Sequence, residues 1–239
     1  MKFYGIKAMN DADSWAEFVK PGKFKAGKSA YSLAHTWQPA NGFPSSVTAV
    51  LAPRFQLTPK RAFIEWEEAL DTAKAPSTTD IMVDAEDSQG NSVPVGVEGK
   101  CSETFAEPIH IWVRDAKMGE TTLGAISPKP TRERRLEFLN ETLGTAFDVN
   151  STLRYQLVHR TASVVLRARC LGATSAVMLV HSFVVPGSQD PNFADWGDFL
   201  KALPTSPTGT KGTLIGSVSL GGVDMFFAWV EDHPVGGRP

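Results

Sequence analysis

Two segments of the sequence alternate between polar and apolar residues with a period of two, and a turn-rich stretch separates them. The first reads Asp80-Ile-Met-Val-Asp-Ala and the second Val93-Pro-Val-Gly-Val-Glu-Gly-Lys, with Asp87-Ser-Gln-Gly-Asn between them. This alternation on both sides of a short polar turn predicts an antiparallel β-hairpin. If the turn is centred near Gln89, residues whose numbers sum to about 178 lie opposite one another, so Asp80 faces Glu98.

The two faces of this hairpin differ in chemistry, because side chains alternate along a strand. One face carries Asp80, Met82, Asp84, Gly96, Glu98 and Lys100, and the other is apolar and carries Ile81, Val83, Val95 and Val97. Two carboxylates that lie opposite each other repel unless a cation lies between them. Oxygen ligands of this kind suit Mg²⁺ or Mn²⁺, and Lys100 can orient or deprotonate a water molecule for attack on a phosphodiester.

The remaining elements are expected from helical periodicity, from apolar runs and from the Gly and Pro residues that end them. The expected helices cover 11–20, 29–37, 58–73, 132–143, 155–170 and 195–200, and the expected strands beyond the hairpin cover 176–183 and 224–230. This order is typical of an α/β domain, in which helices pack on the faces of a mixed sheet. We expect a helical N-terminal region (1–57) packed on an α/β core (58–239).

Composition argues against several classes of protein. No stretch approaches the ~18 to 20 apolar residues of a membrane span, and the first residues show no secretory signal, so we expect no membrane association and a cytoplasmic location. Cys101 and Cys170 lack Cys-x-x-Cys spacing, which disfavours a structural zinc site and suits a reducing compartment. The formal net charge of −2 gives no general attraction to nucleic acid, so such a partner needs a local basic patch.

Asp80, followed by Glu98-Gly99-Lys100 on the next strand, resembles the signature of the PD-(D/E)xK nuclease superfamily. The resemblance implies a restriction endonuclease-like fold and a nuclease dependent on Mg²⁺ or Mn²⁺ that hydrolyses phosphodiester bonds, with DNA as the expected partner and a homodimer left open. It implies that Asp80 and Glu98 bind the metal and that Lys100 positions the nucleophile. A further metal ligand is expected from a preceding helix, for which Glu65 and Glu68 are the candidates.

The same superfamily commonly has a polar residue on the helix that follows the hairpin. In this sequence that helix would supply Gln156 to the catalytic centre, and Arg154, His159 and Arg160 to nucleic acid. Gln156 and Arg160 are four residues apart, so they share one face of the helix. The segments Tyr31-Ser-Leu-Ala-His and Tyr155-Gln-Leu-Val-His-Arg-Thr-Ala-Ser are also similar to a family of bacterial proteins to which no activity is attached.

Two other interpretations stay open. In the first, the chain is a non-catalytic module on a degenerate nuclease fold, and it binds nucleic acid or protein through the arginines near Gln156. In the second, Gly22-Lys-Phe-Lys-Ala-Gly27-Lys28-Ser29 is a P-loop; a P-loop follows a buried strand, however, and the residues before Gly22 predict a helix. The lysines at 20, 23, 25 and 28 either line a phosphate-binding groove or form a solvated surface.

Overall fold

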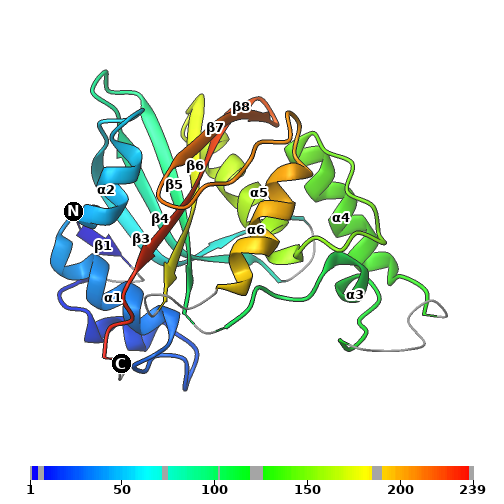
Figure 1. Cartoon of the computed structure of the whole chain (residues 1–239), viewed down its shortest axis with the longest axis horizontal. Helices are drawn as coiled ribbons and strands as arrows, with labels where there is room; N and C mark the ends of the chain where they lie inside the picture. Colours follow the sequence, from blue (N-terminus) through cyan, green and yellow to red (C-terminus); the bar gives the residue numbers. More distant parts are fainter. Residues whose placement is uncertain are drawn as a thin grey trace.

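The computed structural model describes residues 2–4, 8–71, 75–101, 103–118, 126–184 and 190–236. The chain forms a mixed sheet with helices on both faces (Figure 1), which confirms the expected α/β class. The strands are β1 (Lys2–Tyr4), β2 (Ala8–Met9), β3 (Thr58–Glu68), β4 (Ser77–Glu86), β5 (Ser92–Lys100), β6 (Ser175–Phe183), β7 (Leu214–Leu220) and β8 (Val223–Asp232). The helices are η1 (Asp13–Glu17), α1 (Ser29–Ala40), α2 (Ser45–Leu51), α3 (Ile109–Trp112), α4 (Pro130–Leu143), α5 (Tyr155–Cys170) and α6 (Pro191–Lys201). The strand order is β2-β1-β3-β4-β5-β6-β8-β7.

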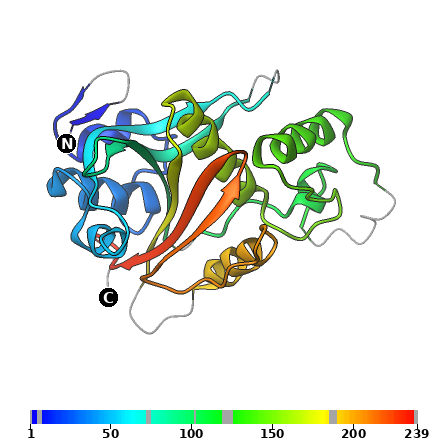
Figure 2. The same ribbon diagram turned by 90° about the horizontal axis from the view of Figure 1, so that it is seen from above.

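The helices form one layer on each face of the sheet. α1 and α2 lie against one face, and α5, with α4 and α6 beside it, lies against the other (Figures 1 and 2). The apolar residues expected on one face of the hairpin are buried together on the α1 side: Ile81, Val83, Val95 and Val97. On the other side Gly96 allows α5 to approach, because a Cβ at this position would lie 2.3 Å from Val164 Cγ2. Both faces of the hairpin are therefore covered, and α5 lies over the face that carries Glu98.

The hairpin predicted from the alternation is formed by β4 and β5. Its ladder pairs Ile81 with Val97 and Glu86 with Ser92, which is the expected register. Asp87 Oδ1 closes the turn by accepting the backbone N–H groups of Gln89 at 2.8 Å and Asn91 at 2.9 Å. β5 and β8 each pair with β6 in parallel, so the hairpin leads into the parallel part of the sheet.

The segment expected to be a helix over 58–73 is instead the strand β3, although its last two residues lie outside the described ranges. Thr58-Pro59 is a typical helix start, but the residues that follow alternate, and Ala62 and Ile64 are buried on one face. β3 pairs with β4 along its length, and this ladder supplies the backbone hydrogen bonds that a helix would make internally. The helix prediction was wrong because the partner strand lies elsewhere in the sequence.

The region before Thr58 is less helical than expected. α1 confirms the helix predicted over 29–37, and α2 is an additional helix. Residues 11–20 contain only the 3₁₀-helix η1, in which Trp15 is the one buried residue, so there is too little apolar face to stabilise a longer helix. β1 and β2 pair beside β3 and extend the sheet.

The helices predicted over 132–143, 155–170 and 195–200 are confirmed as α4, α5 and α6, and the strands predicted over 176–183 and 224–230 as β6 and β8. Gly144 ends α4 in the left-handed conformation, with φ of +69°, as a helix-terminating glycine does. No helix within the described ranges has the length and apolar character needed to cross a membrane.

Candidate functional site

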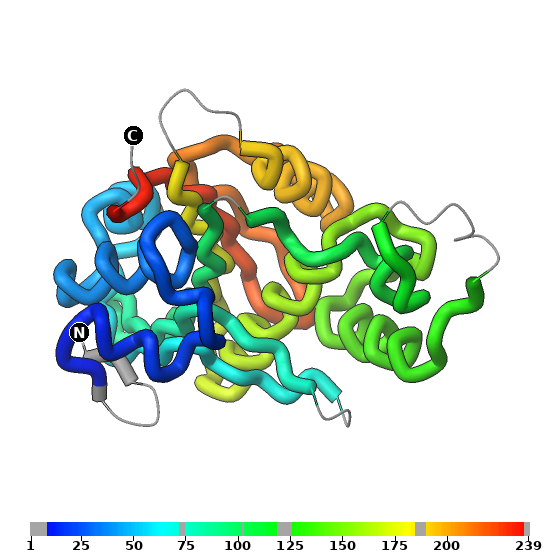
Figure 3. Tube along the Cα trace, turned by 90° about the horizontal axis from the view of Figure 1, so that it is seen from below, coloured from blue at the N-terminus to red at the C-terminus, as the bar shows by residue number. Residues whose placement is uncertain are grey.

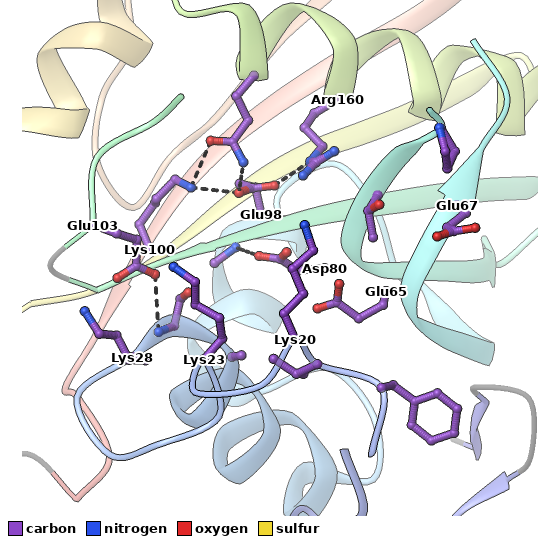
Figure 4. A pocket seen from close by; sticks show the side chains of 18 of the residues that line it. Lys20, Lys23, Lys28, Glu65, Glu67, Asp80, Glu98, Lys100, Glu103 and Arg160 are labelled. Atoms are coloured by element: carbon purple, nitrogen blue, oxygen red, sulfur yellow. Dashed lines mark hydrogen bonds and ion pairs between the residues drawn. The ribbon is translucent and has the colours of Figure 1, made fainter. Parts of the chain in front are cut away.

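A cavity of about 650 Å³ lies where β3, β4 and β5 meet the first turns of α5 and the loop that precedes α1. Figure 3 shows this loop, in blue, beside strands that are far from it in the sequence. The lining includes five acidic and five basic side chains: Glu65, Glu67, Asp80, Glu98 and Glu103, and Lys20, Lys23, Lys28, Lys100 and Arg160 (Figure 4). The fold thus brings many charges of both signs to one cavity.

Three of the acidic residues lie at the same level on three adjacent strands. The ladder pairs on either side of Glu65 on β3 place it opposite Asp80 on β4. The β4–β5 ladder ends with Ile81 opposite Val97, so Asp80 and Glu98 are the next residues on the two strands, and the charge of Glu98 acts on Asp80. Glu65 has a left-handed backbone, with φ of +50°. Such a conformation costs about 1–3 kcal/mol in a residue other than glycine, and strained positions of this kind cluster at functional sites.

Glu98 is the most enclosed of these carboxylates, with 2% of its surface exposed. Its Oε1 accepts hydrogen bonds from Lys100 Nζ at 2.7 Å and from Gln156 Nε2 at 2.6 Å. Its Oε2 accepts one from Arg160 Nε at 2.6 Å. Burial acts to raise the pKa of Glu98, but the charges of Lys100 and Arg160 outweigh it and hold the pKa below its ordinary value. Glu98 is therefore ionised at neutral pH.

Lys100 is held in one orientation by the residues around it. Gln156 Oε1 accepts from Lys100 Nζ at 3.1 Å and from the backbone N–H of Ala106, also at 3.1 Å. The ammonium lies 4.8 Å from the centre of the Phe105 ring, a cation–π distance. Because Gln156 also donates to Glu98, it links the ammonium and the carboxylate.

Asp80 and Glu65 are the other two carboxyl groups of this row. Asp80 Oδ2 accepts the backbone N–H of Gly99 at 2.8 Å. Burial raises the pKa of Asp80 well above its ordinary value, and the nearby charges of Glu98 and Glu65 raise it further. Burial is also the main cause that raises the pKa of Glu65 to about 7, against the opposing charge of Arg160. Both carboxyl groups are costly to ionise, which is the situation that a bound cation relieves.

The donor chemistry of this row suits a hard divalent cation, because carboxylate oxygens are the ligands that Mg²⁺ and Mn²⁺ prefer. Among the residues that the structure describes, however, no group of three or more His, Cys, Asp and Glu side chains is arranged to hold a metal ion as it stands. Glu98 is bound by Lys100 and Arg160 instead. The chemistry of these side chains therefore suits a metal ion. To bind the ion, the side chains would have to turn toward it.

A family model described as "Domain of unknown function (DUF6946)" matches residues 8–234. The chain belongs to this family. No curated protein and no solved structure matches the chain. The DUF6946 match includes every residue of the cavity lining, so the site lies within the family's domain and its chemistry must be argued from its geometry.

Most of the site residues predicted from the sequence of this DUF6946 domain lie in the cavity. They are Glu65, Asp80, Glu98, Lys100, Gln156, His159 and Arg160. Glu68 and Arg154 are not part of the lining. Glu68 accepts a hydrogen bond from Trp66 Nε1 at 3.1 Å, and Arg154 forms an ion pair with Asp195 at 2.9 Å. Glu67 takes the place expected for Glu68 because β3 has the period of a strand, so that Glu65 and Glu67 share a face.

His159 lies in the lining but carries no positive charge to offer to nucleic acid. Burial lowers its pKa well below the ordinary value, and the nearby charges of Arg160, Arg135 and Lys100 add to this effect. Arg160 Nη1 donates to Ser77 Oγ at 3.0 Å, which leaves the serine proton for His159 Nδ1 at 2.8 Å. This assignment makes His159 neutral, with its proton on Nε2.

The P-loop pattern lacks the structural context that nucleotide binding by a P-loop requires. The element before Gly22 is the 3₁₀-helix η1, and no strand leads into the loop within residues 10–28. Lys20, Lys23 and Lys28 nevertheless line the cavity, whereas Lys25 does not. From the sequence we expected these lysines either to line a phosphate-binding groove or to form a solvated surface. No sequence pattern indicated that they face the hairpin.

Proposed function

We propose that this DUF6946 domain is a metal-dependent nuclease that hydrolyses phosphodiester bonds at the cavity between β3, β4, β5 and α5. The observation that carries the proposal is the row of Glu65, Asp80 and Glu98 across adjacent strands, with Lys100 beside it. Two carboxyl groups with raised pKa values, next to a third carboxylate in a cavity, support the proposal because perturbed pKa values cluster at functional sites.

Asp80 and Glu98 would hold the metal ion, and Glu65 would complete its ligands. When bound, Mg²⁺ or Mn²⁺ supplies a positive charge that stabilises the developing negative charge on the phosphoryl oxygens. Lys100 orients the attacking water, and Gln156 fixes the direction of the Lys100 ammonium. Arg160 keeps Glu98 ionised. The water oxygen would attack in line, so that the new P–O bond forms as the ester P–O bond to the leaving oxygen breaks. The water proton would pass to solvent or to a deprotonated group of the cavity, and the leaving oxygen would take a proton from solvent.

The test is a cleavage assay with linear single-stranded DNA, duplex DNA and RNA, each with Mg²⁺, with Mn²⁺ and with a chelator. We expect cleavage that depends on the metal and falls by about 10³-fold in Asp80→Asn, because a lost metal ligand removes several kcal/mol of transition-state stabilisation. Glu68→Gln is the matched control, since it changes a carboxylate outside the cavity and should retain full activity. Equal cleavage by wild type and Asp80→Asn would contradict the assignment.

A non-catalytic binding module is the second candidate, and a specific observation favours it. Both oxygens of Glu98 already accept hydrogen bonds from internal partners, as they would in a site that had lost its metal. This candidate predicts that the protein binds nucleic acid or another protein with an affinity that does not depend on Mg²⁺. It also predicts that no substrate is cleaved. The cleavage assay and a titration with metal therefore separate the two functions.

A further inference from the structure

The loop from Lys20 to Lys28, here called the lysine loop, forms one wall of the cavity opposite the carboxylates. It makes two tight turns, in which Lys23 N donates to Lys20 O at 3.0 Å and Lys28 N donates to Lys25 O at 3.1 Å. Gly22 and Gly27 adopt the left-handed conformation that such turns need, each with φ of +78°. Figure 4 shows Lys20, Lys23 and Lys28 on the same side of the cavity, below Asp80 and Lys100.

These lysines differ from the other basic residues of the cavity in forming no salt bridge within the part of the chain that the structure describes. Lys100 and Arg160 are both bound to Glu98. No ion pair joins Lys20, Lys23 or Lys28 to any residue that the structure describes. The charge of Lys20 acts on the Glu65 carboxyl group, but no salt bridge among the described residues occupies any of the three ammonium groups, so they can contact an anionic ligand.

The lysine loop also leads directly into α1, a helix of 12 residues whose first residues, Ser29 and Ala30, line the cavity. The N-terminus of a helix attracts negative charge because its first N–H groups have no partner within the helix. Here the backbone N–H of Ser29 donates to Glu103 Oε1 at 3.3 Å, so a carboxylate of the protein already lies at this position. An anionic ligand at the lysine loop would meet both the three ammonium groups and this helix end.

The dimensions of the cavity limit what that ligand can be. A volume of about 650 Å³ is in the range of small-molecule pockets, about 300–1,000 Å³, and is smaller than the groove with which a protein follows many nucleotides. A phosphodiester carries a single negative charge, and fewer than three ammonium groups can balance it. A cluster of three therefore indicates a more highly charged group. A terminal phosphate monoester carries a charge of about −1.5 to −2 and three acceptor oxygens, which fits such a cluster.

We propose that the lysine loop binds the terminal phosphate of a nucleic-acid strand, so that the adjacent phosphodiester lies over Asp80 and Glu98. The substrate is then a phosphorylated strand end, and not the interior of a duplex. This inference rests on the proposed nuclease function for the identity of the ligand, and on Lys20, Lys23 and Lys28 for its position.

The test measures binding without cleavage. An internally labelled single-stranded oligonucleotide is titrated with the protein in a chelator, in three forms that carry a 5′-phosphate, a 3′-phosphate or no terminal phosphate. We expect one phosphorylated form to bind at least about tenfold more tightly than the unphosphorylated form. Lys23→Ala and Lys28→Ala should each remove most of this preference and reduce the salt dependence of binding by about one lost contact. Lys25→Ala is the matched control from the same loop and should retain it.

Two results would overturn the inference: equal binding of all three oligonucleotides, or an equal loss of preference in Lys25→Ala. Competition by inorganic phosphate and by a nucleoside monophosphate distinguishes the source of the phosphate. Both should compete more weakly than the phosphorylated oligonucleotide, and a monophosphate that binds as tightly would exclude a strand end as the substrate. The nuclease proposal fails separately, since phosphate preference without cleavage in Mg²⁺ contradicts only the chemistry, whereas cleavage without preference contradicts only the lysine loop.

Discussion

Two carboxylates of the hairpin, Asp84 and Glu98, are buried against arginines of α5, but their surroundings differ. Asp84 is bound by Arg167 through two hydrogen bonds, at 2.9 Å from Nε and 2.6 Å from Nη2, and by Arg61 Nη2 at 3.0 Å. Glu98 is bound by Arg160, seven residues earlier on the same helix. Both clusters therefore pair a carboxylate of the β4–β5 hairpin with an arginine of α5.

The difference lies in the balance of charge and in access to a cavity. At Asp84 one carboxylate meets two arginines, and neither Asp84 nor Arg167 lines the cavity. At Glu98 two further carboxyl groups, Asp80 and Glu65, lie beside the ion pair and have raised pKa values. A buried ion pair alone is weak evidence for function, because such pairs also occur as structural elements. The excess acid at Glu98, and not the ion pair, is what indicates a site.

The largest expected effect is an opposite outcome for the two aspartates. Asp84→Asn leaves Arg167 with a buried, unpaired charge, which should lower the free energy of unfolding by about 3 kcal/mol and leave the activity of the folded protein unchanged. Asp80→Asn should reduce activity by about 10³-fold and leave stability equal or higher, because the neutral side chain avoids the cost of ionisation. Chemical denaturation and the cleavage assay, done on both variants, measure the two effects.

The distinction between the two clusters would be contradicted if the two variants behaved alike. Loss of stability in Asp80→Asn with activity intact would make the Glu98 cluster a second structural ion-pair cluster. Loss of activity in Asp84→Asn at full stability would place the second cluster in the chemistry of the site.

A smaller effect is expected in the pH dependence of stability. The pKa of Glu65 is about 7 in the folded chain and 4.5 as its ordinary value, so the folded state binds more protons than the unfolded state between these values. The contribution of Glu65 to stability is therefore complete below pH 4.5, and it is lost as the pH rises through about 7. We expect Glu65→Gln to remove a fall on the order of 2 kcal/mol between pH 5 and 8, after allowance for the partial exposure of the side chain.

Denaturation of wild type and Glu65→Gln at several pH values checks this prediction. Glu68→Gln is again the control and should keep the slope of the wild type. A slope that is identical in all three proteins would mean that Glu65 titrates normally, and the excess acid on which the comparison depends would be absent.

The smallest expected effect is stabilisation by metal. At a Mn²⁺ concentration ten times its Kd, a site that exists only in the folded chain raises the free energy of unfolding by about 1.4 kcal/mol. This increase should be present in Asp84→Asn, measured against its own baseline, and absent in Asp80→Asn. A thermal-shift titration shows it, and equal shifts in both variants would assign the bound metal to a different place.

The hairpin could be predicted from the sequence because its turn, register and alternation are local. The pairing of Ile81 with Val97 follows from the turn at Asp87-Ser-Gln-Gly-Asn, and Asp80 and Glu98 are the residues next to this pair. The position of Gln156 and Arg160 could also be predicted from the sequence, because helical periodicity determines which residues of α5 share a face.

The rest of the site depends on contacts between distant segments. Thr58-Pro59 has the local chemistry of a helix start, and only pairing with β4 makes the segment a strand, which replaces Glu68 by Glu67 in the cavity. The lysine loop comes to Asp80 through the packing of α1 on the sheet, for which its own residues carry no local signal. The structure of β3 and the position of the lysine loop therefore depend on long-range packing, which local sequence patterns do not show.

The most direct test of the central claim is a crystal structure of the wild-type protein grown at pH 8 with Mn²⁺, in which anomalous scattering locates the metal. The account predicts a single strong peak in the cavity, about 2.1 Å from carboxylate oxygens of Asp80 and Glu98, with Lys100 turned from Glu98 toward a water molecule. A structure that shows no peak there, with Glu98 still bound to Lys100 and Arg160 and Asp80 to Gly99, would contradict it.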